Sequence, residues 1–260
     1  MNKRVVYPIA TVLLSGFFYA FPMRRSHAAG ETVWNTLASY VTYFNTEDTG
    51  RCENIRVASG LINGVTLQAY GDFSFNQTVG RRTADAGFQQ AKIIVNGEYV
   101  LGVGGGVCQV STTLYNAALL SGLAITEYHA HSLRVGYVEP SRDAMVSTGS
   151  DLKIFNPYPF AVRLFANTEK GSVRVYFAGE KKPYDYAIVS RTIGETPPPP
   201  PIVKDGAEEG VLRAEKNGLT SEAYLETYKN GRLLARKRLR KDVYLAIQGI
   251  VVKKNGNPRN

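Results

Sequence analysis

The sequence predicts an α+β fold, in which a mixed domain with a helix packed on antiparallel strands is followed by a small β-rich module. Apolar residues at Val110, Leu114 and Ala117 share one face of a helix that starts at a Cys108 motif. Short alternating segments joined by turn sequences such as Asn-Gly are typical of antiparallel hairpins. Five consecutive prolines, Pro197–Pro201, predict a stiff spacer between the two parts.

Residues 1–28 are predicted to be an export signal. Lys3 and Arg4 precede an apolar run over residues 5–21, and Ser26-His27-Ala28 resembles a cleavage site. The run of 17 residues is at the short limit for a membrane span, so an uncleaved membrane anchor is the alternative. We expect a secreted or cell-envelope protein that contacts a membrane only if this segment is retained.

The net charge of +9 is concentrated at the two ends of the chain. Residues 1–28 hold four basic and no acidic side chains, residues 29–203 hold 14 and 15, and residues 204–260 hold 13 and seven. Because an exported chain has little access to nucleic acid, we expect no such partner. The 44% hydrophobic content excludes a disordered chain, and the two cysteines exclude a four-cysteine zinc site.

The first half of the chain is predicted to hold a linker over residues 29–45 and the mixed domain over residues 46–182. Apolar residues three or four apart predict a helix at about 54–66. A short alternating segment at 73–75 predicts a strand. Residues 92–101 predict a hairpin around an Asn-Gly turn.

The glycine-rich segment leads into a predicted helix over residues 109–121, and Gly122 suits the position just after its last turn. The remainder of the mixed domain is predicted to be strands, at residues 133–137, 152–154, 161–166 and 172–178.

The second part begins with a predicted proline-rich linker over residues 183–203. Residues 204–255 are predicted to form the β-rich module. Its strands are a hairpin of Ser221–Tyr228 and Arg232–Leu239 around Asn230-Gly231, followed by Tyr244–Val252.

Cys108 is the candidate nucleophile because it begins the predicted helix. The first backbone N–H groups of a helix are unpaired and carry partial positive charge, which stabilises a thiolate. The N–H groups of Cys108 and Gln109 could hold an oxyanion during acyl transfer. Two alternatives remain open at this level: a buried structural thiol, and a disulfide with Cys52.

A cysteine nucleophile needs a base, and only His129 and His131 remain beyond the export signal. Both enter the strand predicted at 133–137, on the same face, so their spacing does not choose between them. Asp143 opens the next predicted strand and is a candidate to orient a histidine. The histidine pair lacks a clear third metal ligand, and the glycines match neither nucleotide-binding motif, so we expect no metal and no cofactor.

Several motifs together resemble the VanW family, which is named for a vancomycin-resistance cluster. The resemblance covers roughly residues 46–180, and the block from Gly104 to Asn116 is its most specific part. The C-terminal module resembles, less strongly, a G-five (G5) domain, a small β module of bacterial surface proteins. The motifs that carry the two resemblances are GDFSFN at 71–76, VGRRT at 79–83, GGGVCQVSTTLYN at 104–116, His131-Ser132, Arg142-Asp143-Ala144, YKNG at 228–231 and GIVV at 249–252.

The VanW resemblance implies a cysteine-dependent L,D-transpeptidase, or related carboxypeptidase, that acts on peptidoglycan stem peptides. Cys108 would be the nucleophile, His131 rather than His129 the base, and Asp143 its orienting partner. The residues expected to contact the peptide are Gly105, Gly106, Gln109, Ser111, Thr112, Thr113 and Ser132.

Two further expectations concern the cell wall. The alternative to an enzyme is a non-catalytic peptidoglycan-binding or vancomycin-resistance accessory protein. The basic strand of the C-terminal module is expected to bind an anionic wall polymer or glycan through Arg232, Arg236, Arg238 and Arg240.

Overall fold

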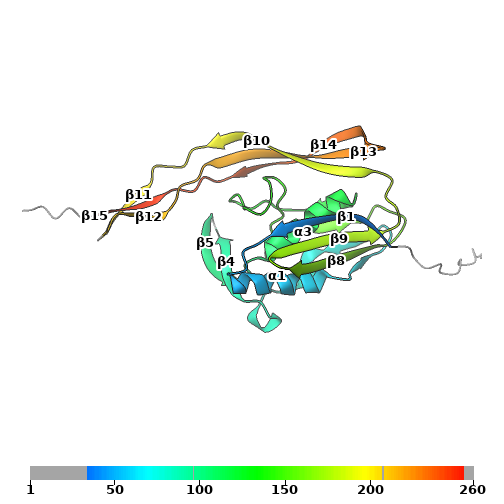
Figure 1. Cartoon of the computed structure of the whole chain (residues 1–260), viewed down its shortest axis with the longest axis horizontal. Coiled ribbons are helices and arrows are strands. Elements are labelled where there is room, and N and C mark those ends of the chain that lie inside the picture. Colours follow the sequence, from blue (N-terminus) through cyan, green and yellow to red (C-terminus); the bar gives the residue numbers. More distant parts are fainter. Residues whose placement is uncertain (1–33, 96, 207, 255–260) are drawn as a thin grey trace, which may run out of the picture. The chain divides into compact units, whose positions relative to one another are not determined.

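The computed structural model describes residues 34–95, 97–206 and 208–254 (Figure 1). The predicted export signal at 1–28 lies outside the described residues. Within them, no helix combines the length and the apolar character needed to cross a bilayer.

An antiparallel four-stranded sheet is the base of the mixed domain. Its strands are β1 (Asn35–Tyr43), β9 (Ser172–Gly179), β8 (Val162–Glu169) and β2 (Thr66–Leu67), hydrogen-bonded in that order. Alternate residues of β8 and β9 are buried, as expected for a sheet with one face on a core. The predicted hairpin of 161–166 and 172–178 is confirmed, but the predicted linker at 29–45 is wrong because most of it forms β1.

Two helices pack on this sheet. Helix α1 (Thr49–Ile62) contacts β8, and helix α3 (Val107–Leu120) contacts β1 and β9 (Figure 1). The first helix was predicted at 54–66, and it begins earlier because the Asp48 carboxylate accepts a 3.1 Å hydrogen bond from the backbone N–H of Arg51. It ends at Ile62, just before Gly64, which has a φ of 86°.

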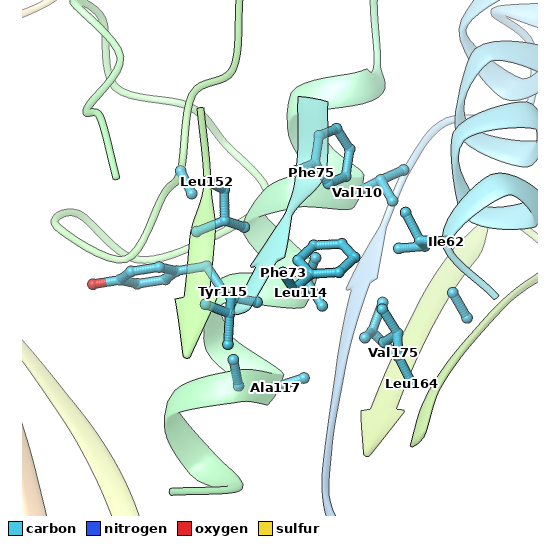
Figure 2. Packing of buried hydrophobic residues seen from close by; sticks show 14 of the residues in the cluster. Ile62, Phe73, Phe75, Val110, Leu114, Tyr115, Ala117, Leu152, Leu164 and Val175 are labelled. Atoms are coloured by element: carbon cyan, nitrogen blue, oxygen red, sulfur yellow. The ribbon is translucent and has the colours of Figure 1, made fainter. Parts of the chain in front are cut away.

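Helix α3 is the centre of the core. Every residue in it except Cys108 and Leu120 is buried. Figure 2 shows Val110, Leu114 and Ala117 of this helix among apolar side chains from α1 and the sheet. The prediction of a helix at 109–121 is confirmed, with its start two residues earlier.

The mixed domain also contains smaller elements. The strands β3 (Asp72–Ser74), β7 (Lys153–Phe155) and β6 (Ala124–Glu127) form a three-stranded sheet, and β4 (Gln90–Val95) pairs with β5 (Glu98–Val103) in the predicted hairpin. Phe75, which was predicted to end a strand, instead begins the short helix α2 (Phe75–Val79), for which the Ser74 hydroxyl is the cap. A single 3₁₀ turn spans Ala84–Ala86.

The C-terminal part consists of two three-stranded sheets. The first has the order β10 (Asp185–Thr196), β13 (Gly218–Lys229), β14 (Arg232–Tyr244), and the second β11 (Ile202–Gly206), β15 (Ile250–Lys254), β12 (Gly210–Arg213). The hairpin of β13 and β14 confirms the β-rich character predicted for this module. The last strand was predicted at Tyr244–Val252 but begins only at Ile250, because Tyr244 still belongs to β14. The predicted linker at 183–203 is wrong over most of its length, because β10 is a full partner of β13.

The predicted strand at 133–137 is also wrong, and residues 128–152 contain neither helix nor strand. Leu133 and Val135 are buried, which produced the alternating pattern. The backbone groups of this segment bond elsewhere. For example, the Ser132 carbonyl accepts from Leu245 N at 2.8 Å, beyond the end of β14.

We predict that Gly105→Ala destabilises the protein by about 1–3 kcal/mol, because its new Cβ would lie 2.6 Å from the Lys92 carbonyl oxygen on β4. Gly60→Ala is the matched control. Position 60 is an exposed site inside α1 with nothing within 4 Å of a Cβ, so this change should stabilise by about 0.5–1 kcal/mol. Chemical denaturation measures both, and a neutral Gly105→Ala would contradict the close packing of the glycine turn, residues 104–106, against β4.

Candidate functional site

A cleft of about 910 Å³ opens at the N-terminal end of α3. The glycine turn and the first residues of α3 form one wall, and the hairpin β4–β5 and the irregular segment after β6 contribute others. Cys108 and His131 both line the cleft.

Cys108, His131 and Asp143 come together although α3 supplies the cysteine and the irregular segment of residues 128–152 supplies the other two. The backbone N–H of Val146 donates to Cys108 Sγ at 3.5 Å, and the Cys108 thiol donates to the Val146 carbonyl at 3.4 Å. The His131 ring lies close enough to Cys108 for each group to shift the pKa of the other. On the other side of the ring, His131 Nδ1 lies 2.7 Å from Asp143 Oδ2, which leaves Nε2 for the sulfur. His131 and Asp143 are 6% and 1% exposed, so both are shielded from water.

These contacts shift all three pKa values toward the charged forms. Burial raises the pKa of the Cys108 thiol, but the hydrogen bond and charge of His131, the Val146 amide and the Arg82 guanidinium together lower it below its ordinary value. Burial lowers the pKa of His131, but its bonds to Asp143 and Cys108 raise it to about 9. Burial raises the pKa of Asp143, but His131, Arg240 and Tyr244 bring it to about 2. The arrangement therefore favours a thiolate beside an imidazolium.

Two residues that the sequence analysis did not connect with the site hold Asp143 on the side away from His131. The Tyr244 hydroxyl donates to Asp143 Oδ1, and Arg240 Nη1 donates to the Asp143 carbonyl at 2.6 Å. Both side chains belong to β14 and are buried. The backbone N–H of Ser141 in turn donates to the Tyr244 hydroxyl at 2.7 Å. A strand of the C-terminal part thus fixes the carboxylate that orients the histidine.

The two histidines of the predicted pair point to different partners. His129 Nε2 lies 3.0 Å from Glu127 Oε1 in a partly exposed hydrogen bond, while His131 lies beside Asp143 and Cys108. The expectation that both share one strand face is wrong, because no strand forms there.

The disulfide alternative is contradicted by the structure, in which both cysteines are free. The Cys52 thiol lies on α1 and donates to the backbone carbonyls of Asn45 and Thr46 at 3.6 Å.

The expected pair of oxyanion donors is reduced to one. The backbone N–H of Gln109 donates to the Gly106 carbonyl at 2.9 Å, so it is not available to a substrate. The Cys108 N–H has no hydrogen-bond acceptor among the described residues, which leaves it available to hold an oxyanion.

Three hydroxyl residues of α3 that were expected to contact a substrate are instead fully buried and bonded within the protein. Ser111 Oγ donates to the Ala144 carbonyl at 2.6 Å, and Thr112 Oγ1 accepts from the Ala144 N–H at 2.9 Å. Thr113 Oγ1 bonds to the Gln109 carbonyl and the Thr42 hydroxyl. They hold the segment after Asp143 and the strand β1, so the expectation of substrate contact is wrong for these three.

The other expected contact residues divide between the cleft and the protein interior. Gly105, Gly106 and Gln109 line the cleft, although the Gln109 amide is already bonded to Arg51, Thr42 and the Tyr43 carbonyl. Ser132 is not among the lining residues, and its carbonyl accepts from Leu245 N.

The geometry defines a class of protein domain. It is a mixed α+β domain in which a cysteine at the start of a helix lies beside a buried histidine–aspartate pair. Residues 50–178 match the family model described as VanW like protein, and this part of the chain is a VanW family domain, as the motifs predicted.

Two curated relatives share the domain. The chain is 40% identical over 154 residues to "Uncharacterized protein YoaR" of Bacillus subtilis strain 168, covering 59% of this chain and 51% of that protein. It is 25% identical over 137 residues to "Vancomycin B-type resistance protein VanW" of Enterococcus faecalis strain ATCC 700802 / V583, covering 50% of each. The chain thus spans about half the length of these relatives.

The C-terminal part matches the crystal structure of HP0197-G5 at 20% identity and a TM-score of 0.15. The match covers 26% of this chain and 97% of that one.

We predict that Tyr244→Phe shifts the pH profile of Cys108 alkylation upward by roughly half a unit to one unit. Loss of the hydroxyl frees Asp143 Oδ1 from β14, so the carboxylate is held less firmly against His131, its stabilisation of the imidazolium weakens and the pKa of the thiol rises. Iodoacetamide alkylation as a function of pH measures this in a Cys52→Ser background. Tyr228→Phe is the control, since its hydroxyl bonds to Glu226 on the same sheet. An unchanged profile in Tyr244→Phe would contradict the coupling.

Proposed function

We propose that the protein is a cell-envelope cysteine acyltransferase that acts on peptidoglycan stem peptides in the manner of an L,D-transpeptidase. The observation that carries the proposal is the Cys108 thiol, which faces a buried His131–Asp143 pair at the wall of a cleft. This is the arrangement that activates a cysteine for attack on a carbonyl group.

The first half-reaction forms a thioester. Cys108 Sγ attacks the carbonyl carbon of an amide between an L-centre and a D-centre, and a C–S bond forms. The carbonyl oxygen takes the negative charge, which the free N–H of Cys108 stabilises. The C–N bond then breaks while His131 Nε2 gives its proton to the leaving amine, and Asp143 holds the ring in position through Nδ1.

The second half-reaction returns the enzyme to its starting state. An amine of a second stem peptide attacks the thioester carbon and passes a proton to His131. The C–S bond breaks, the thiolate leaves and a new amide remains. With water in place of the amine, the same steps release a shortened peptide, which is the carboxypeptidase variant.

An envelope location is part of this proposal. The predicted export signal at 1–28 and the relationship to a protein named for vancomycin resistance support it.

We also expected the basic strand β14 to bind an anionic wall polymer, but fewer of its arginines are free for this than the sequence indicates. Arg240 is buried, Arg236 lies 3.4 Å from a Glu226 oxygen, and Arg238 lies 3.0 Å from a Glu222 oxygen. Within the described residues, Arg232 is the one arginine of the four without an ion pair, so these four arginines give wall binding only a small electrostatic basis.

We expect the mature protein to exchange or trim defined muropeptides, and Cys108→Ala to lower that rate at least ~10³-fold. His131→Ala should have a similar effect, because it removes the proton donor. Mass spectrometry of the products measures both, and it also separates cross-linking from trimming.

Cys52→Ser is the matched control for that experiment and should react at the wild-type rate. Wild-type turnover by Cys108→Ala would refute the thioester route. Retention of muropeptides without any product from the wild-type protein would favour the alternative, a non-catalytic peptidoglycan-binding or resistance accessory protein.

A further inference from the structure

We infer that the cleft beside Cys108 contains a binding subsite for a carboxylate of the peptide, formed by the guanidinium groups of Arg51 and Arg82. This inference rests on the proposed function and deepens it, because it specifies an anionic rather than a neutral peptide next to the reacting carbonyl. Both arginines line the cleft.

Arg82 is held in place by a neutral partner. Its Nη2 donates to Asn76 Oδ1 at 2.5 Å, and the Asn76 amide is itself fixed by the carbonyls of Ser147 and Ser150, each at 3.0 Å. The guanidinium lies 5.8 Å from the centre of the Phe75 ring. Arg82 is half-buried, and its charge is close enough to the sulfur to help lower the pKa of Cys108.

Arg51 is held in the same way on the other side of the glycine turn. Its Nη2 donates to Gln109 Oε1 at 2.6 Å, and the Gln109 amide donates to the Thr42 hydroxyl and the Tyr43 carbonyl. The guanidinium lies 5.8 Å from the centre of the Tyr137 ring. Amide oxygens thus orient both arginines, and among the described residues neither guanidinium forms an ion pair, although Asp151 and Cys108 attract Arg82 at longer range.

The charge balance of the cleft supports an anionic ligand. Apart from the Cys108–His131 pair, its lining contains four cations, Arg51, Arg81, Arg82 and Lys92, and a single acid, Asp48. In the part of the chain that the structure describes, none of the four cations forms an ion pair. Some arginines outside the cleft do have acidic partners, as Arg238 and Arg240 are paired with Glu222 and Asp242.

A carboxylate is the group that best fits two such arginines. The planar fork of a guanidinium matches the two oxygens of a carboxylate, and each arginine keeps donors beyond the one bonded to its amide. A stem peptide offers this group either at the chain end beyond the scissile amide or on a side chain. Either source would be attracted to the cleft and held near Cys108.

The test must separate ligand attraction from the effect of Arg82 on the thiol pKa. Iodoacetate and iodoacetamide consume the same thiolate, so the ratio of their rates cancels the thiolate population and reports the attraction of an anion. We expect Arg82→Gln and Arg51→Gln to lower this ratio roughly fivefold each in a Cys52→Ser background, and added salt to lower it in the parent.

Arg174→Gln is the matched control, because Arg174 is exposed on β9 and does not line the cleft; its ratio should equal that of the parent. Ratios in Arg51→Gln and Arg82→Gln that equal the parent's would overturn the inference. The alkylation experiment needs no enzymatic turnover, so it tests the subsite even if Cys108 proves not to be catalytic.

Donor peptides identify the source of the carboxylate. Amidation of the carboxyl that binds the two arginines should lower kcat/KM for the parent but should have little further effect on Arg82→Gln. Amidation of the other carboxyl should change kcat/KM equally in both proteins. A chain-end amide and a side-chain amide are compared separately. If neither amide distinguishes the two proteins, the carboxylate assignment is wrong.

Discussion

The carboxylate of Asp143 is the group on which the rest of the site depends. One oxygen accepts from the backbone and ring of His131, and the other accepts from the Tyr244 hydroxyl. Because the group is 1% exposed, almost none of its charge is compensated by water. These bonds tie the irregular segment that carries the histidine to β14 of the C-terminal part. Separation of the two would leave a buried charge without its donors.

The polar residues of helix α3 have a structural role, because they form hydrogen bonds with the same irregular segment. Ser111 and Thr112 bind both backbone groups of Ala144, and Asn116 binds the Arg142 carbonyl and side chain. The chain on either side of Asp143 is therefore clamped to the helix that starts at Cys108. The nucleophile and its partner are positioned by one rigid element, which is what precise proton transfer requires.

Local patterns predicted much of this structure from the sequence. Helical spacing found α3, the Asn-Gly turns found two hairpins, and the glycine-rich helix start drew attention to Cys108. The residues that hold Asp143 could not be found this way, because Tyr244 lies 101 positions away and its pattern is that of any buried strand residue. The hydroxyls of α3 were misread for a similar reason, since nothing local distinguishes a buried clamp from a ligand contact.

The central claim is that Asp143 and Cys108 keep His131 in its charged form. The most direct measurement is an NMR titration of the His131 ring nitrogens in the full chain. The account predicts that both nitrogens stay protonated at neutral pH and titrate at about 9, and that Asp143→Asn moves this titration to lower pH. A ring that is already neutral at pH values near the ordinary 6.5 of histidine would contradict it.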